Sequence, residues 1–93
     1  MLGAAVVGLG VGRNHCKGYV MSPHAELRAI CDLQPERRKQ YGEMYGVPAY
    51  DSIEKLLERN DIDIVSVCTP DHLHAQSVIP FLRAGKHVLL EKP

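Results

Sequence analysis

The sequence predicts an α/β fold with a doubly wound parallel sheet. Two observations support this prediction: short apolar runs typical of buried strands alternate with segments of helical spacing, and the first run ends in three closely spaced glycines, Gly8, Gly10 and Gly12. Strands separated by helices form βαβ units with right-handed crossovers. We expect the strand order 3-2-1-4-5 in a single domain, because 93 residues leave no room for two.

The first unit consists of a strand, a helix and a second strand. LGAAVVG, residues 2–8, is an apolar run of small residues that leads into the glycines, and AELRAICD, residues 25–32, is the second strand. Between them we predict a helix from Arg13 to Val20, which the Ser-Pro pair at 22–23 closes because the residue before a proline disfavours helical geometry. The residues that share its inward face are Cys16, Tyr19 and Val20.

A polar helix follows the second strand. Pro35 stands where a first helical turn tolerates proline, and Gly46 can end the helix in a left-handed conformation. This helix has few apolar residues for an inward face, chiefly Tyr41, Met44 and Tyr45.

The next elements are a short extended segment, a helix and the fourth strand. The extended segment is VPAY, residues 47–50. Asp51 and Ser52 form an N-cap pair ahead of a helix, whose apolar residues at helical spacing are Ile53, Leu56 and Leu57. DIVSVCT, residues 63–69, is apolar with little alternation, as expected of a strand covered on both faces.

The last helix and strand complete the pattern. Asp71 caps a helix that Gly85 ends, and the apolar residues that repeat along it are Ala75, Val78, Ile79 and Leu82. Pro80 lies inside this helix, where it removes a backbone donor, so we expect a kink. HVLL, residues 87–90, is the last strand, and EKP follows it.

The charge balance argues against several classes of partner. Eleven basic and eleven acidic residues give a formal net charge of zero, so long-range attraction favours neither nucleic acid nor an anionic membrane. No apolar stretch approaches the ~20 residues of a membrane span, and no basic region precedes an apolar core at the N-terminus. We therefore expect a cytoplasmic protein with a small-molecule ligand.

The cysteines and histidines do not predict a metal site. Cys16, Cys31 and Cys68 form no C-x-x-C pair, and we expect them to be reduced core residues. His72 and His74 lie two residues apart on a predicted helix and point to different faces, and no cysteine or carboxylate completes a ligand set. His15 could face the ligand cleft or pack in the core.

The strand ends indicate where a ligand binds. Open α/β sheets bind ligands outside the carboxyl ends of their strands, at the point where the strand order reverses. Here that point lies between the first and fourth strands. The stretches that follow the predicted strand ends are residues 8–12, Asp32, residues 69–71 and residues 91–93. Every chemically suggestive stretch therefore converges on one edge of the sheet.

The glycine segment has the features of a nucleotide site. Gly8 permits a tight turn, Gly10 lets the backbone approach a pyrophosphate, and the helix that follows presents free amides and its positive dipole end. Asp32 ends the second strand 24 residues after Gly8, and an acidic residue at this distance accepts hydrogen bonds from ribose hydroxyls. The alternative is a strand-helix turn with a capping aspartate; the agreement of turn, spacing and strand position favours a ligand.

The spacing of the glycines leaves a second ligand open. The dinucleotide fingerprint G-x-G-x-x-G would place its third glycine where Arg13 stands, and the glycine comes one place earlier, at Gly12. G-x-G-x-G before an acidic strand end also resembles the S-adenosylmethionine loop of methyltransferases. Those enzymes usually carry an acidic residue two places before the first glycine, where this chain has Val6, which weakens the alternative.

The last third of the sequence resembles a known family. VCTPDHLHA and AGKHVLLEKP closely resemble the cofactor domain of the Gfo/Idh/MocA oxidoreductases, as do GRNH after the glycines and the strand end at Asp32. The resemblance spans essentially all 93 residues, and EKP and TP-x-x-x-H are its most specific parts. It implies the Rossmann-like NAD(P)-binding domain of a sugar or polyol dehydrogenase, which transfers a hydride between a substrate carbon and nicotinamide.

The resemblance also implies a set of site residues. Lys92 matches a lysine that contacts the substrate hydroxyl, and as the expected catalytic residue it could hold an alkoxide as hydride leaves. Asp32 favours NAD over NADP because a carboxylate repels the 2′-phosphate, although Arg37 and Arg38 lie nearby in the next helix. The expected cofactor-binding residues are Gly8, Leu9, Gly10, Val11, Gly12, Arg13, Asp32, Thr69, Pro70, Asp71, His74, Glu91 and Lys92.

The chain ends where the family continues. In the family EKP lies inside the cofactor domain, and a second domain supplies an aspartate and a histidine that work with the lysine. We therefore expect residues 1–93 to form an incomplete dinucleotide-binding domain, which takes a sugar or polyol only with the absent domain and has little turnover alone. The alternative is a self-standing nucleotide-binding or regulatory module without catalysis. For the full-length family the resemblance implies a homo-oligomer.

Overall fold

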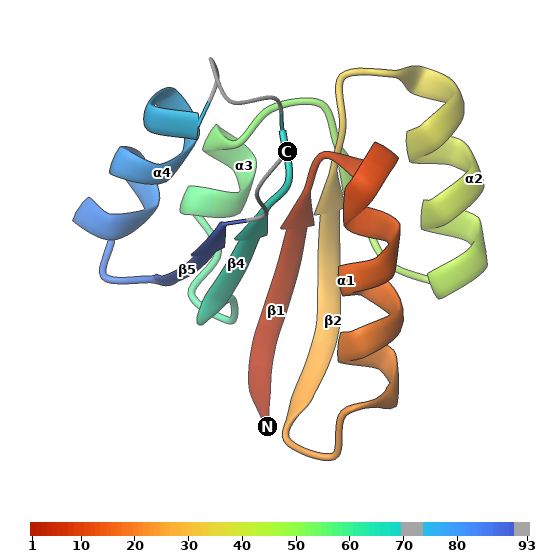
Figure 1. The fold of residues 1–93 in the computed structure, drawn as a ribbon, viewed down its shortest axis with the longest axis horizontal. Coiled ribbons are helices and arrows are strands. Elements are labelled where there is room, and N and C mark those ends of the chain that lie inside the picture. Colours follow the sequence, from red (N-terminus) through yellow and green to blue (C-terminus); the bar gives the residue numbers. More distant parts are fainter. Residues whose placement is uncertain (70–73, 91–93) are drawn as a thin grey trace.

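The computed structural model describes residues 1–69 and 74–90, which are built on one sheet of five strands (Figure 1). The strands are β1 (Leu2–Val7), β2 (Ala25–Cys31), β3 (Ala49–Tyr50), β4 (Ile64–Val67) and β5 (His87–Leu90). Neighbouring strands are parallel, in the order β3-β2-β1-β4-β5. The predicted α/β class and the predicted order 3-2-1-4-5 are confirmed.

Helices cover both faces of the sheet (Figure 1). Their bounds are Leu9–Met21 for α1, Pro35–Tyr45 for α2, Glu54–Leu57 for α3 and His74–Arg83 for α4. Side chains of α1 and α2 pack on one face, and side chains of α3 and α4 pack on the other. This arrangement makes the sheet doubly wound, as expected for βαβ units with right-handed crossovers.

Strand β1 runs through the middle of the core. Successive residues of the strand point to opposite faces, so Val6 packs under α1, whereas Val7 packs with Leu56 of α3 and Phe81 of α4. All four of these side chains are buried. Because both faces of the strand are covered, its sequence is continuously apolar rather than alternating.

Helix α1 begins at Leu9, so the predicted start at Arg13 is wrong. Gly8 has a φ of 87°, in the region that favours glycine, and it reverses the chain direction within one residue. The N–H of Gly12 already donates to the carbonyl of Gly8, at 3.1 Å, which closes the first helical turn. The glycine segment and the first turn of α1 are therefore the same piece of chain.

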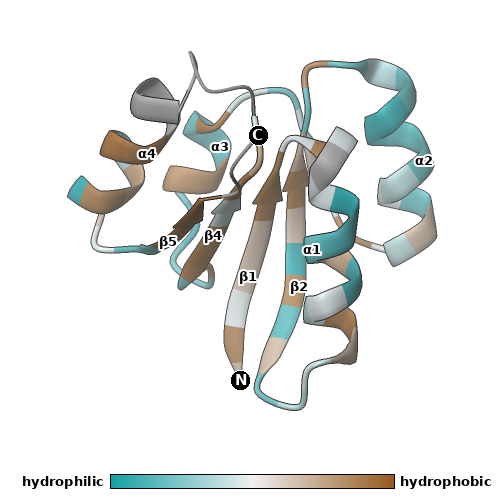
Figure 2. Cartoon of the chain, viewed as in Figure 1, coloured by the Kyte–Doolittle hydropathy of each residue, from teal (hydrophilic) through white to brown (hydrophobic). Residues whose placement is uncertain are grey.

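Helix α2 has the predicted ends. Pro35 is its first residue, where the missing N–H is no loss, and Gly46 caps it with a φ of 64°. Hydrophilic residues dominate the helix in Figure 2, and none of its residues is fully buried. The helix is therefore held to the sheet by few apolar contacts.

Two apolar residues that we predicted on inward faces are exposed: Val20 of α1 and Met44 of α2. The aromatic residues predicted on the same faces do pack inward, Tyr19 from α1 and Tyr41 and Tyr45 from α2. The aromatic rings of Tyr41 and Tyr45 stack on each other, with their centroids 6.3 Å apart. Bulky rings one helical turn apart leave the methionine on the solvent side.

Helix α3 is a single turn without a side-chain cap. The predicted N-cap at Asp51 and Ser52 is wrong, because Ile53, itself in helical conformation, precedes the helix and no side chain bonds to its first amides. The Asp51 carboxylate lies instead 3.3 Å from the ammonium of Lys55.

Helix α4 continues through Pro80 as far as Arg83, so the proline does not end it, and the kink stays a prediction. Gly85 follows with a φ of 79°, which confirms the predicted end of the helix. Asp71, the predicted cap, lies outside the described residues. No helix in the described part of the chain has the length and apolar character needed to cross a bilayer. The three cysteines are buried and reduced, as predicted.

Candidate functional site

The carboxyl ends of β1, β2 and β4 lie together, at the top of the sheet in Figure 1. Gly8, Asp32 and Thr69 come within two residues of these strand ends. The N–H of Leu9 donates to Oδ2 of Asp32 at 2.7 Å, which ties the β1 and β2 ends together. The structure therefore brings these predicted site residues to one place, the point where the strand order reverses.

Gly8 occupies a position that no other residue fits. Its φ of 87° strains any residue with a side chain. A Cβ added there would also lie 3.0 Å from the carbonyl carbon and oxygen of Cys68 and 3.1 Å from the amide nitrogen of Thr69. The end of β4 thus passes directly against the turn, and Gly8 permits both the turn and this close approach.

The position of Gly12 explains why the third glycine comes one residue earlier than in the dinucleotide fingerprint. A Cβ added at Gly12 would lie 2.7 Å from Cγ1 of Val6 and 3.4 Å from the sulfur of Cys68. Gly12 therefore allows α1 to pack closely on β1 and β4, which is the role of the third glycine in a dinucleotide fingerprint. The helix starts at Leu9, so this role falls on the residue one place earlier than the fingerprint requires.

Gly10 lies in the first turn of α1 and is exposed. The amide hydrogens of Gly10 and Val11 have no acceptor within the helix, because a helix leaves its first N–H groups unpaired. Such amides, together with the positive end of the helix dipole, bind phosphate groups. With no side chain at Gly10, the backbone is open to a pyrophosphate.

Asp32 is buried and is bound by backbone amides on both carboxylate oxygens. Oδ2 accepts the N–H of Leu9 at 2.7 Å, and Oδ1 accepts the N–H of Gln34 at 2.8 Å. The side chain is 5% exposed. The capping aspartate that we considered as the alternative is thus present, and the same bonds hold the first turn of α1 over the end of β2.

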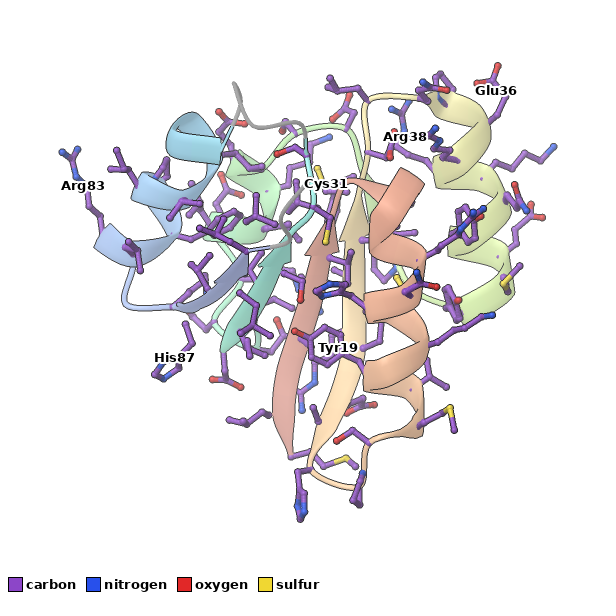
Figure 3. The ribbon with its side chains drawn as sticks, in the orientation of Figure 1. Tyr19, Cys31, Glu36, Arg38, Arg83 and His87 are labelled. Atoms are coloured by element: carbon purple, nitrogen blue, oxygen red, sulfur yellow. The ribbon has the colours of Figure 1, made fainter. Side chains whose placement is uncertain are left out.

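Two arginines of α2 surround this carboxylate. Nη1 of Arg37 lies 3.6 Å from Oδ2 of Asp32, and it is 3.2 Å from the position of a Cβ on Gly10. Nη1 of Arg38 donates to the carbonyls of Asp32 and Leu33, at 2.9 and 3.1 Å. In Figure 3 Arg38 extends from the start of α2 toward the end of β2. The corner beside the glycines therefore holds two positive charges and one negative charge.

Thr69 has a buried hydroxyl that lacks a partner in the described part of the chain. Its Oγ1 is shielded from solvent and makes no hydrogen bond with any described residue. An unpaired buried hydroxyl costs free energy, and such groups occur where a ligand or water completes the bond. This atom at the switch point is consistent with a ligand that fills the cleft.

Several predicted site residues cannot be placed by the structure. Pro70, Asp71, Glu91 and Lys92 lie outside the described residues, as does the histidine at 72. His74 opens α4, and Val11 lies in the first turn of α1, but only their backbones are described. Arg13 is exposed on α1.

A polar cluster between α1 and β4 was not predicted from the sequence. Ser66 is fully buried, and its hydroxyl lies 2.9 Å from Nδ1 of His15 and 2.6 Å from the hydroxyl of Tyr19. Burial raises the pKa of Tyr19, and the hydrogen bond with Ser66 opposes this rise. His15 thus packs toward the sheet. The signal in the sequence was a single serine inside an apolar strand.

Metal ligands do not gather at this site. Among residues 1–69 and 74–90, no three His, Cys, Asp or Glu side chains are placed to hold a metal ion. The chemistry of the described site is that of amides, one carboxylate, two guanidinium groups and a hydroxyl, which suits a phosphate-bearing nucleotide.

Comparison with known proteins identifies a matching family. A family model described as "Oxidoreductase family, NAD-binding Rossmann fold", under the name GFO_IDH_MocA, matches residues 2–93. A curated dTDP-3,4-didehydro-2,6-dideoxy-alpha-D-glucose 3-reductase of Streptomyces violaceoruber is 40% identical over 81 residues, which are 87% of this chain and 24% of the relative. The chain thus spans about a quarter of the length of that relative.

Solved structures agree with this match. The scyllo-inositol dehydrogenase of Lactobacillus casei, with bound NAD(H) and scyllo-inositol, superposes with a TM-score of 0.91 at 30% identity, and the match covers 100% of this chain and 28% of that one. A 3-ketoreductase of Actinomadura kijaniata, with TDP-benzene and NADP, gives 0.88 at 36% identity over 99% of this chain and 30% of that one. The methyltransferase alternative gains no support from these matches.

Proposed function

Because this chain belongs to the Gfo/Idh/MocA family of NAD-binding oxidoreductases, we propose that it binds a nicotinamide dinucleotide for the oxidation or reduction of a sugar or polyol. The glycine turn supports this proposal most directly: Gly8, Gly10 and Gly12 each have the geometry that a pyrophosphate site needs. The two relatives with solved structures bind NAD(H) and NADP, so the cofactor class is NAD(P).

The residues at the sheet edge fit a dinucleotide. The first turn of α1 offers the amides of Gly10 and Val11 to the pyrophosphate. Asp32 would meet the ribose beside them, and the hydroxyl of Thr69, which has no partner among the described residues, follows the end of β4 on the other side of the switch point. These groups come from three separate strand ends, so one extended ligand can contact all of them.

The chemistry of the proposed site combines a bound cofactor with groups of the chain. Nicotinamide, when bound, accepts or donates a hydride. From the family resemblance we propose that Lys92 contacts the substrate hydroxyl and stabilises negative charge on its oxygen. Lys92 and Glu91 follow β5, whose carboxyl end lies at the same edge of the sheet as Gly8.

Catalysis requires more than these 93 residues in this proposal. The chain corresponds to about a quarter of the length of the relatives that act on dTDP-sugar and inositol substrates. We expect the isolated chain to bind NADH and to show no substrate-dependent NADH formation. A homo-oligomer and a cytoplasmic location belong to the same proposal; the reduced state of the three cysteines supports the location.

The test is a titration of the full chain into NADH, followed by nicotinamide fluorescence, with S-adenosylmethionine as a competitor. The chain contains no tryptophan, so protein emission interferes little. Saturable binding that S-adenosylmethionine does not displace is the expected result. A folded chain that does not bind NADH would contradict the proposal.

Gly10→Val provides a site-specific variant for this titration. Gly10 is exposed, and the atoms nearest to an added Cβ belong to the guanidinium of Arg37, at 3.2 Å, which can move; the valine should therefore leave the fold intact while its side chain blocks the approach of the pyrophosphate. The matched control is Gly18→Ala, also in α1, where an added Cβ has no atom within 4 Å. Loss of NADH binding in Gly10→Val but not in Gly18→Ala would locate the site at the first turn of α1.

A further inference from the structure

Resting on the proposed function, we propose that Arg37 is the residue that lets this chain accept NADP(H) as well as NAD(H), by binding the 2′-phosphate. Asp32 taken alone predicts a preference for NAD, because a carboxylate repels a second phosphate. The surroundings of Asp32 in the structure change this expectation.

The carboxylate of Asp32 is already bound by backbone amides of the protein. Its two oxygens accept the N–H groups of Leu9 and Gln34, and the side chain is 5% exposed. Hydrogen bonds from backbone amides stabilise the charged form of a carboxylate and occupy its oxygens. Asp32 therefore repels a phosphate less than an exposed carboxylate would.

Arg37 is placed where a 2′-phosphate would arrive. Its guanidinium lies 3.6 Å from Oδ2 of Asp32 and 3.2 Å from the Cβ position of Gly10, between the ribose carboxylate and the pyrophosphate turn. The side chain is 41% exposed, and its distance of 3.6 Å to Asp32 is long for a charge-assisted hydrogen bond. Arg37 can therefore turn toward a ligand without breaking a tight internal contact.

Arg38 has a different role from Arg37. Its Nη1 is bound to the carbonyls of Asp32 and Leu33, which fixes it against the end of β2. It adds a second positive charge to the corner while Glu36, the neighbouring acidic residue of the first turn, points away from the sheet in Figure 3. With Asp32, Arg37 and Arg38 counted together, the corner carries one net positive charge.

The two cofactors would use this corner differently. A ribose with a free 2′-hydroxyl donates to Asp32 and leaves Arg37 paired with that carboxylate. A 2′-phosphate recruits Arg37, whose planar guanidinium matches phosphate oxygens. We infer that the dissociation constants of the chain for NADH and NADPH differ by less than about tenfold.

The experiment compares Arg37→Gln with the wild-type chain in titrations of NADH and NADPH at fixed ionic strength. The glutamine removes the charge and keeps much of the length of the side chain. We expect the affinity for NADPH to fall on the order of tenfold and the affinity for NADH to change less than about twofold. Lys39→Gln, an exposed charge of the same helix, is the matched control and should leave the NADPH/NADH ratio unchanged.

The outcomes separate this inference from the proposed function. If the wild-type chain binds neither cofactor, the proposed function fails and the inference fails with it. If it binds NADH but not NADPH, or if Arg37→Gln weakens both cofactors equally, only the inference is overturned. A urea transition measured for each variant shows whether the fold is retained, and Arg37→Lys, which restores the charge, should recover part of the NADPH affinity.

Discussion

The hydroxyl groups of Tyr19 and Ser66 lie 2.6 Å apart between α1 and β4. Nδ1 of His15 approaches the same serine oxygen at 2.9 Å, so one buried hydroxyl joins two side chains of the helix to the strand. These contacts lie one to two helical turns beyond the glycine segment, on the helix that carries the phosphate-binding amides. The cluster therefore fixes the position of α1 on the sheet through directional bonds.

Ser66→Ala should destabilise the chain more than Tyr19→Phe. The alanine removes a partner from both Tyr19 and His15, whereas the phenylalanine leaves Ser66 bonded to His15. We expect a loss of about 1–3 kcal/mol in the free energy of unfolding for the first variant and about 0.5–1.5 kcal/mol for the second. Urea denaturation measures both. Tyr41→Phe, which removes a hydroxyl from α2 away from this cluster, is the control, and equal stability of Ser66→Ala and the wild type would contradict the prediction.

Gly12→Ala and Gly18→Ala should have opposite effects although both lie in α1. The added methyl meets Cγ1 of Val6 at 2.7 Å in the first variant and has no atom within 4 Å in the second. Overpacking should cost about 1–3 kcal/mol at Gly12, and alanine should stabilise the helix by about 0.5–1 kcal/mol at Gly18. The midpoints of urea transitions test this difference; a Gly12→Ala chain as stable as the wild type would show that α1 does not pack closely on β1.

Stability should fall as pH rises above the ordinary pKa of a thiol. Burial raises the pKa of Cys16 and of Cys31 from 9.0 to about 12. Between these values the unfolded chain loses protons that the folded chain keeps, so each thiol lowers the free energy of unfolding by about 1.4 kcal/mol per pH unit. The free energy of unfolding therefore keeps its full value below pH 9 and decreases as the pH rises toward 12.

Cys31→Ala should reduce this pH dependence. Urea transitions under a phosphine reductant, measured at a series of pH values from neutral to alkaline, give the slope for each chain. The variant has no titratable group at position 31, so the decrease of its free energy of unfolding with pH above pH 9 should be shallower by the contribution of one thiol. Identical slopes for the variant and the wild type would mean that Cys31 ionises equally in both states.

Leu89→Lys should weaken self-association of the chain. Strand β5 is an edge of the described sheet, and Leu89 on it and Leu82 on α4 are about half exposed. Unpaired strand edges with apolar side chains promote association, and a lysine opposes it. Light scattering at increasing concentration measures the effect. Val20→Lys, an equal charge on α1, is the control, and an equal effect of both variants would indicate net charge rather than the edge.

The fold could be predicted because its signals are local. The apolar runs mark the strands, Pro35 and Gly46 mark the ends of α2, and the handedness of the crossovers then gives the strand order. The start of α1 could not be predicted in the same way, since four residues with small or apolar side chains suit a turn as well as a helix. The bond from Leu9 to Asp32 across 23 residues favours the helix, and no local pattern contains that contact.

The candidate site was predicted in part. Gly8, Gly10, Asp32 and Thr69 meet at the sheet edge as the strand order requires. The sequence placed Arg37 nearby but could not show that its guanidinium lies over Gly10, because that position depends on how α2 packs against α1. It also could not indicate the partners of Ser66, which come from a helix about 50 residues away in the chain.

The central position of β1 has a consequence for the order of folding. Strand β1 precedes both of its neighbours in the chain. Strand β2 follows after a single helix, whereas the bond from the N–H of Gly3 to the carboxylate of Asp63 spans 60 residues. Pairing β1 with β4 closes a longer loop than pairing β1 with β2, so it costs more chain entropy before stabilising contacts form. During synthesis, β1, α1 and β2 can therefore assemble first, and the other edge of β1 is paired only when β4 has been made. The strand that is made earliest therefore keeps one edge unpaired until β4 has been made.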